Sequence, residues 1–237
     1  QVSSRGLGDV YKRQVMFRSL VKQLAARHGL NATFMAKPFI DESGNGFHLH
    51  YSLWSEGKNI FADAGMLNDR GRHFLGGMQQ RMAEASICGA ATVNAYRRRQ
   101  PLSFCPVNAS WGLDNRTVAL RVIEGSDSAV RIEKRDAGAD CNPYLLMAAD
   151  IAAGLDGIEG KTEPTAITTG NAYEDDNAPP IPLDLADAIS LARNSGWLRD
   201  VLGADQHEIW LQQAERELAF FNQQVTPFET ARYLGTF

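Results

Sequence analysis

The segment GNGFHLHYS, residues 44–52, contains side chains that could line a binding site. Alternation along a strand would project His48, His50 and Ser52 from one face. Two imidazoles and a hydroxyl would then stand beside a glycine-rich turn, where a ligand can approach the backbone closely. The alternative is a partly buried hairpin with incidental histidines, and an isolated H-x-H pattern favours that alternative.

A second segment, RIEKR at residues 131–135, combines charges of both signs. On a strand, Arg131, Glu133 and Arg135 would share one face. A carboxylate between two guanidiniums should stay ionised, and it could bind Mg²⁺ or Mn²⁺ as a hard oxygen ligand. The arginines could hold phosphate or carboxylate oxygens through paired hydrogen bonds. Taken alone, the segment favours an ordinary solvated face of mixed charge.

Two further groups of arginines accompany these segments. Arg116 and Arg121 lie five positions apart in NRTVALR, so a bulge or a strand end must intervene if both serve one site. NAYRRR, residues 94–99, ends a predicted helix, where its arginines either complement the helix dipole or clamp an anion. Many arginines with few carboxylates suit an anionic substrate, several phosphates and a metal ion, which is the requirement of phosphoryl transfer.

Helices and strands must position these segments, and the sequence predicts both. The predicted helices cover 15–28, 73–98, 143–157 and two segments after 184, the second over 206–224. The predicted strands are 32–39, 48–54 and a hairpin over 117–124 and 128–135. Asn142, Asp184 and Asp205 with Glu208 are predicted helix caps, and 159–183 is a predicted long surface loop. These elements indicate an α+β fold with a mainly antiparallel sheet and flanking helices.

Composition narrows the class of protein. The 237 residues are 44% hydrophobic and 22% charged, and the net charge of −4 without a basic block argues against nucleic acid as the main partner. No apolar run approaches the ~18 residues that would indicate a membrane-spanning helix. The three cysteines lie far apart without a C-x-x-C pair, which indicates a reducing, cytoplasmic setting. Residues 1–14 lack a periodicity that connects to the segment after them, and we interpret them as a non-native or artefactual leader.

Six motifs in a fixed order resemble the catalytic domain of the glutamine synthetase family. They are FMAKP, GNGFHLHYSLW, NAYRR, DNRTVALR, RIEKR and NPYLLMAADIAAGLDGIEGK. The resemblance runs from about residue 15 to the C-terminus. It implies the C-terminal portion of a glutamine synthetase-like catalytic domain over 15–237, truncated at its N-terminal side.

The resemblance also implies roles for individual residues. His48 and Glu133 correspond to ligands of a divalent metal, Mg²⁺ or Mn²⁺, and Arg116 to the arginine that stabilises the transferring phosphoryl group and contacts substrate. Residues implied to bind ATP are His50, Ser52, Arg121 and Arg131. Residues implied to bind glutamate are Gly44, Arg98, Arg116 and Arg135.

The implied reaction joins glutamate to ammonia or an organic amine at the expense of ATP, through γ-glutamyl phosphate. The family forms homo-oligomeric rings, so a ring is expected for the full-length parent. The carboxylates of the family's first metal site and its small N-terminal β-grasp domain precede the matched region. We therefore expect this chain to be inactive alone.

One position departs from the ammonia-using members of the family. Their P-G-x-E-A-P stretch corresponds here to PLSFCP, residues 101–106, with Phe104 where the glutamate is expected. A phenyl ring cannot attract ammonium by charge or accept its proton, but it can pack against carbon. Phe104 therefore favours an organic amine, as in γ-glutamylpolyamine or γ-glutamylethanolamide synthetases. Glutamine synthetase proper and a non-catalytic structural member of the same fold are the alternatives.

Overall fold

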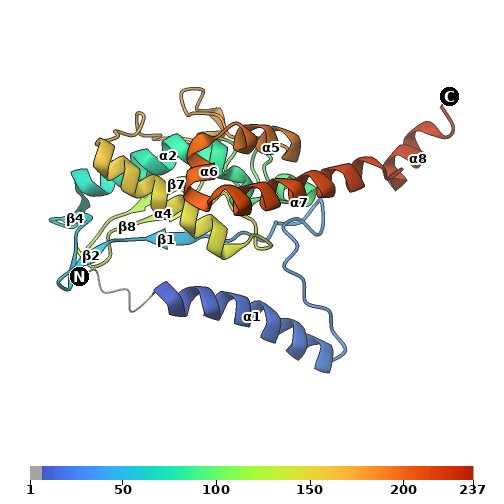
Figure 1. Cartoon of the computed structure of the whole chain (residues 1–237), viewed down its shortest axis with the longest axis horizontal. Helices are drawn as coiled ribbons and strands as arrows, with labels where there is room; N and C mark the ends of the chain where they lie inside the picture. The colour runs from blue at the N-terminus through green and yellow to red at the C-terminus, as the bar shows by residue number, and fades with distance from the viewer. Residues whose placement is uncertain (1–6, 237) are drawn as a thin grey trace.

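The structure is a computed structural model that describes residues 7–236 (Figure 1). Its helices, in chain order, are α1 (Leu7–Arg27), α2 (Asp69–Gly89), α3 (Val93–Tyr96), α4 (Pro143–Gly160), the 3₁₀ turn η1 (Ala172–Glu174), α5 (Leu185–Arg193), α6 (Gly196–Leu202), α7 (Ala204–Asn222) and α8 (Pro227–Tyr233). Its strands are β1 (Leu49–Tyr51), β2 (Trp54–Ser55), β3 (Lys58–Asn59), β4 (Ala62–Asp63), β5 (Met66–Leu67), β6 (Trp111–Leu113), β7 (Leu120–Ile123) and β8 (Arg131–Lys134).

One four-stranded sheet, in the order β1-β8-β7-β6, forms the centre of the fold. β8 pairs antiparallel with β1 and with β7, so the predicted hairpin over 117–124 and 128–135 is confirmed. β6 runs parallel to β7, which makes the sheet mixed at that edge. The pairs β2-β3 and β4-β5 form two small antiparallel ribbons. The predicted α+β class with mainly antiparallel pairing is therefore confirmed.

Helices α2 and α4 pack closely against each other beside this sheet (Figure 1). A side chain at Gly77 of α2 would place its Cβ 2.0 Å from the Ala153 carbonyl oxygen, so only glycine allows this approach. Between the helices and the sheet, Phe61 and Phe74 pack with Leu120 of β7 in one buried apolar cluster. The side chains that point from β7 and β8 towards these helices thus anchor the sheet, and the opposite face remains available for polar residues.

Several predicted helix ends agree with the structure. The Asn142 side chain accepts hydrogen bonds from the backbone N–H groups of Tyr144 and Leu145, and Pro143 occupies the first turn of α4. The Asp184 side chain caps α5 in the same way. The loop predicted over 159–183 begins two residues later, because α4 continues to Gly160, and over the described residues 161–183 η1 is the only helix or strand. These local signals were readable because each depends on a few neighbouring residues.

Other predicted elements are wrong. Residues 32–39 do not form a strand, because the Lys37 N–H bonds the Asn94 side chain and the Ala36 carbonyl bonds the Asn45 N–H. The helix predicted over 73–98 is two helices, since Thr92 caps a new one at α3. Asp205 does not cap a helix, because Gly203 occupies the N-cap of α7 without a side-chain hydrogen bond.

Helix α1 begins at Leu7, eight positions before the predicted start at 15. The backbone over 7–14 is therefore helical and continuous with 15–27, although the sequence pattern of this stretch did not predict a helix. Residues 1–6 of the interpreted leader lie outside the described residues, and its non-native origin stays a prediction. Among the described residues, no helix is both long and apolar enough to cross a membrane.

Candidate active site

Glu133, which is itself buried, occupies the centre of a polar cluster on the face of the sheet opposite helices α2 and α4. The strand register places it directly across from His50 of β1 on one side and from Arg121 of β7 on the other. Cross-strand partners share a face, so all three side chains converge. Glu133 Oε2 accepts hydrogen bonds from Arg121 at 3.2 Å and from Arg135 at 3.1 Å, while Oε1 lies 3.1 Å from His48 Nδ1. Antiparallel pairing thus assembles this cluster from three separate segments.

The guanidinium neighbours of Glu133 differ in part from those predicted. Arg135 is adjacent, as expected, but Arg131 donates instead to His50 Nδ1 at 3.3 Å and to the Ala129 carbonyl. Arg121 takes the second place because β7 pairs with β8 in register. A single-strand pattern could not predict this cross-strand neighbour.

Charges around the cluster set its ionisation. Burial opposes ionisation of Glu133, but the charge of Arg135 and hydrogen bonds from Arg121 outweigh it and lower the pKa of the carboxyl. Burial, followed by the charge of Arg135, lowers the pKa of His48, and burial also lowers that of His50. At neutral pH the cluster therefore holds an ionised carboxylate beside neutral imidazoles, whose lone pairs can bind a metal.

His48 and Glu133 fit as two neighbouring ligands of one divalent ion. Their Nδ1 and Oε1 atoms are 3.1 Å apart, and adjacent ligands of an octahedral Mg²⁺ lie about 3 Å apart. No group of three or more His, Cys, Asp or Glu side chains suited to a metal occurs among the described residues. Waters or phosphate oxygens would have to complete the coordination, as is usual for Mg²⁺.

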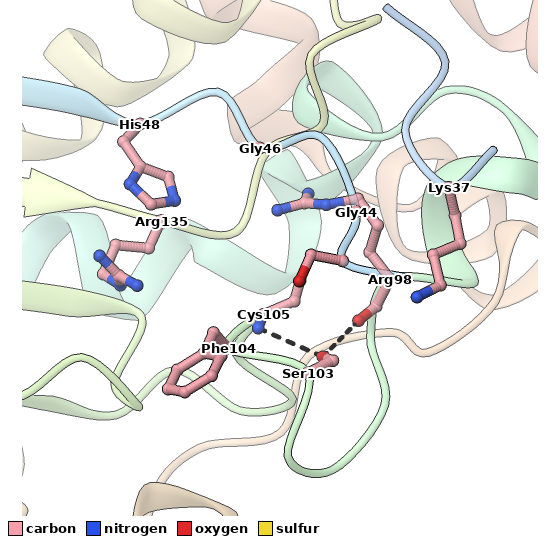
Figure 2. Close-up of a pocket in the computed structure, with 10 residues that line it drawn as sticks. Lys37, Gly44, Gly46, His48, Arg98, Ser103, Phe104, Cys105 and Arg135 are labelled. Carbon is pink, nitrogen blue, oxygen red and sulfur yellow. Dashed lines mark hydrogen bonds between the residues drawn. The ribbon is translucent and has the colours of Figure 1, made fainter. Parts of the chain in front are cut away.

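A pocket of about 220 Å³ opens beside this cluster (Figure 2). Its lining, all within the described chain, contains basic side chains but no aspartate or glutamate. Figure 2 shows that these side chains come from well-separated segments of the chain and surround one space. The lining residues are Lys37, Ser43, Gly44, Gly46, His48, Arg98, Ser103, Phe104, Cys105 and Arg135. Such a lining favours an anionic ligand that carries carboxylate or phosphate groups.

The glycines of the turn are required by close approach to an arginine. A Cβ at Gly44 would lie 2.8 Å from Arg98 Cγ and 2.8 Å from the Ala36 carbonyl oxygen. A Cβ at Gly46 would lie 2.9 Å from an Arg98 guanidinium nitrogen. Arg98 is itself buried and donates to the Ala137 carbonyl at 2.8 Å. The turn and the arginine therefore form one rigid wall of the pocket.

The structure brings most of the sequence-predicted residues together, but not all. The predicted residues that line the pocket are Gly44, His48, Arg98, Phe104 and Arg135. Arg116 precedes β7, as the strand-end alternative required, and its side chain is exposed while its carbonyl accepts from Arg135 at 3.1 Å. The Ser52 hydroxyl accepts a hydrogen bond from Trp54 rather than from a member of the Glu133 cluster.

Five lining residues remain. Gly46 belongs to the predicted glycine-rich turn and Ser43 directly precedes it, whereas sequence reasoning missed the other three. Lys37 lies in the motif FMAKP, and Ser103 and Cys105 flank Phe104 in PLSFCP. FMAKP carried a signal, because it belongs to the ordered set that resembles a known family. PLSFCP follows another motif of that set, NAYRR, with two residues between them. The side-chain types of these three residues alone do not indicate which of them face a ligand.

Comparison with known proteins identifies the family and the fold of the chain. The family model described as "Glutamine synthetase, catalytic domain" matches residues 9–233. This is most of the chain, and it includes the Glu133 cluster and the whole pocket lining. The chain belongs to the glutamine synthetase family. Its predicted resemblance to that family is confirmed, as is the predicted glutamine synthetase-like fold.

Curated relatives include enzymes named for organic amines and enzymes named for glutamine. A glutamate–isopropylamine ligase from Pseudomonas sp. is 38% identical over 226 residues, covering 93% of this chain and 49% of that protein. A gamma-glutamylethanolamide synthetase from Streptomyces coelicolor is 39% identical, covering 93% and 47%. A glutamine synthetase from Thermococcus kodakarensis is 35% identical, covering 92% and 54%. The chain spans about half the length of these relatives.

Solved structures of similar fold agree with this assignment. GmaS without ligand superposes with a TM-score of 0.84 at 35% identity, covering 94% of this chain and 52% of that chain. GmaS in complex with ADP superposes with a TM-score of 0.85 at 34% identity, covering 94% and 53%. The described fold is thus shared with a protein that has been solved in complex with ADP.

Proposed function

We propose that the protein is an ATP-dependent glutamate–amine ligase that forms a γ-glutamyl amide. The observation that carries this proposal is the pocket beside the Glu133 cluster. Three of its lining residues, Lys37, Arg98 and Arg135, are basic, which suits glutamate. The side chain of Phe104, which is 64% exposed, offers carbon rather than charge to the attacking nucleophile.

The proposed chemistry has two steps. An oxygen of the glutamate γ-carboxylate attacks the γ-phosphorus of ATP, an O–P bond forms, and ADP leaves. The amine nitrogen then attacks the acyl carbon of γ-glutamyl phosphate, inorganic phosphate leaves, and the nitrogen releases a proton. Basic side chains favour both steps because they neutralise charge on several oxygens at once.

Each residue has a proposed role in this scheme. His48 and Glu133 hold Mg²⁺ or Mn²⁺, which when bound neutralises charge on phosphate oxygens. Arg116 contacts the transferring phosphoryl group. His50, Ser52, Arg121 and Arg131 bind ATP, and Gly44, Arg98, Arg116 and Arg135 bind glutamate. The two functions meet at Arg135, which lines the pocket and also donates to Glu133.

We further propose that this chain needs additional sequence for turnover. It spans about half the length of its relatives, and within the described residues the cluster offers a metal only two well-placed ligands. ATP- and glutamate-dependent phosphate release by the chain alone, above a Glu133→Ala control, would overturn this proposal.

Glutamine synthetase activity is the second candidate, favoured by the glutamine synthetases among the relatives. A panel of nucleophiles separates the two candidates. The full-length protein is supplied with glutamate, ATP, Mg²⁺ and either ammonium, methylamine, ethanolamine, isopropylamine or putrescine. Turnover with at least one amine is expected to exceed turnover with ammonium. Efficient use of ammonium with none of the amines would reject the amine-ligase proposal.

A pair of variants in one loop sharpens this test. Phe104→Glu introduces a carboxylate at the pocket and is expected to lower kcat/KM for amines while raising it for ammonium. Leu102→Glu is the matched control, because Leu102 lies in the same loop, also has a positive φ, and does not line the pocket. Equal responses from the two variants would contradict a role for Phe104 in nucleophile selection.

A further inference from the structure

The loop that carries Phe104 adopts a backbone that needs support. Leu102 and Phe104 have φ angles of +63° and +58°, a left-handed region that L residues with side chains enter only at a cost. Inside the loop, the Ser103 hydroxyl bonds the carbonyls of Arg98 and Gln100. These bonds close the loop on itself, but they do not fix its position over the pocket.

Support from outside comes from the distant segment 170–175, here called the strap, which contains η1. The Tyr173 hydroxyl donates a hydrogen bond to the Cys105 carbonyl at 3.1 Å. This carbonyl belongs to the residue directly after Phe104, so the bond holds the chain at the base of the phenyl side chain. Burial raises the pKa of Tyr173, so its hydroxyl remains protonated and able to donate at neutral pH.

A second set of bonds ties the strap to the same part of the chain. The Asn108 side chain donates to the Ala172 carbonyl at 2.7 Å and to the Asp175 carbonyl at 3.4 Å. Ala172 is fully buried, so the strap is anchored by packing as well as by hydrogen bonds. The loop over 101–109 and the strap therefore form one hydrogen-bonded unit.

The strap also holds the loop that carries Arg116. The Asn115 side chain donates to the Gly170 carbonyl at 2.8 Å, and the Ala172 N–H donates to the Thr117 hydroxyl at 3.0 Å. These two bonds flank Arg116 in sequence. One short strap thus bonds both the Phe104 loop and the Arg116 loop, which approach it from separate segments of the chain.

We propose that the strap is a specificity element of the nucleophile site, and that Tyr173 is the positioning residue that holds Phe104 over the pocket. The inference rests on the proposed function, in which Phe104 faces the attacking nucleophile. Tyr173 is not a catalytic residue, because it acts through the Cys105 carbonyl. Loss of its hydroxyl loosens the Phe104 loop and weakens capture of the nucleophile, while binding of ATP is left unchanged.

The test compares three variants of the full-length protein. Tyr173→Phe removes the hydroxyl and keeps the ring, and Asn108→Ala releases the strap without altering Tyr173. Glu174→Gln is the matched control. Among the strap contacts given above, none involves the Glu174 side chain, which accepts a hydrogen bond from Asn171 inside the strap itself. Loss of one hydrogen bond predicts about a fivefold rise in KM for the nucleophile in Tyr173→Phe, with KM for ATP unchanged. Asn108→Ala should shift the same parameter in the same direction.

Amide hydrogen exchange of the peptide over 101–106 gives a readout that does not depend on turnover. Exchange there is expected to rise about fivefold in Tyr173→Phe and to stay at the wild-type level in Glu174→Gln. A nucleophile KM and a 101–106 exchange rate both equal to wild type would overturn the inference, as would equal rises in every KM. If ammonium proves to be the only nucleophile, the proposed function fails, but the ammonium KM still decides the role of Tyr173.

Discussion

Glu133 and Lys134 are adjacent in sequence, but their side chains lie on opposite faces of β8. Glu133 faces the cluster of His48, Arg121 and Arg135, whereas Lys134 points into the core, where its ammonium lies 2.7 Å from Asp150 Oδ1. The two faces of β8 thus carry two charged groups, the Glu133 cluster and the Lys134–Asp150 pair, with different roles. One group is placed to bind a ligand, and the other joins the sheet to helix α4.

The first prediction concerns the outward face. Glu133→Gln keeps the shape of the side chain. It removes the negative charge that lies between two guanidiniums, and with it one proposed carboxylate ligand of the metal. We expect metal-dependent turnover of the full-length protein to fall by at least about 100-fold, with weaker Mn²⁺ binding in the presence of ATP. Metal titrations monitored by calorimetry and a phosphate-release assay would measure the two effects.

Asp114→Asn is the control for this change. Asp114 also accepts a hydrogen bond from Arg121, at 2.7 Å, but its side chain is 73% exposed. Exposed ion pairs contribute little, so this variant should bind Mn²⁺ as the wild type does. Equal losses in the two variants would show that Glu133 acts only by holding Arg121.

The second prediction concerns the inward face. Lys134 lies within 3.5 Å of Asp136 and 2.7 Å of Asp150, and all three side chains are almost completely buried. Lys134→Met would leave two buried carboxylates without their ammonium partner. We expect the free energy of unfolding to fall by about 3–5 kcal/mol, measured by urea denaturation.

A double variant tests whether this loss arises from the ion pair. Adding Asp150→Asn to Lys134→Met removes one of the stranded charges, so the two effects should be less than additive. The Tyr51 hydroxyl, which donates to Asp150 Oδ2 at 2.7 Å, can still bond the amide oxygen. Fully additive losses would mean that Lys134 stabilises the fold by packing alone.

The two faces of β8 also show which contacts strand alternation could predict and which it could not. Strand alternation correctly grouped Glu133 with Arg135, because period-two spacing depends on one strand only. It could not predict the approach of Arg121, which depends on the register between two strands. Nor did it predict Lys134 in the core, because a buried charge is stable only when a distant carboxylate meets it, here on helix α4.

The same contrast holds for the pocket, where the sequence predicted some lining residues but not the distant contacts that support them. Arg98 and Phe104 were identified through motifs that resemble a family, and the structure places both in the lining. The support of the Phe104 loop by Tyr173 joins residues 68 positions apart, and no local pattern encodes that contact. Likewise, the break between α2 and α3 depends on the Thr92 cap, which a run rich in alanine and methionine obscured.

The third prediction concerns the cysteines. Cys88, Cys105 and Cys141 are free and buried, and burial raises the pKa of Cys88 and of Cys141 to about 12. The thiolate is the reactive form, so at pH 8 only about one thiol in 10⁴ would be reactive at either position. We expect iodoacetamide at pH 8 to label neither residue in the folded protein and both in urea. Rapid labelling of either cysteine in the folded protein, without urea, would contradict the burial of these thiols.

The fourth prediction uses two neighbouring arginines of the same turn. Arg98 is 5% exposed and lines the pocket, whereas Arg97 is exposed, and its guanidinium lies over the Phe221 ring, 5.7 Å from the ring centroid. Arg98→Lys replaces a planar fork with a point charge, so paired hydrogen bonds to a carboxylate are lost. We expect KM for glutamate to rise by about 10- to 100-fold, with KM for ATP little changed. Arg97→Lys should leave both constants near wild type in the same steady-state assay. A matching rise in glutamate KM there would show that general charge, rather than the position of Arg98, governs binding.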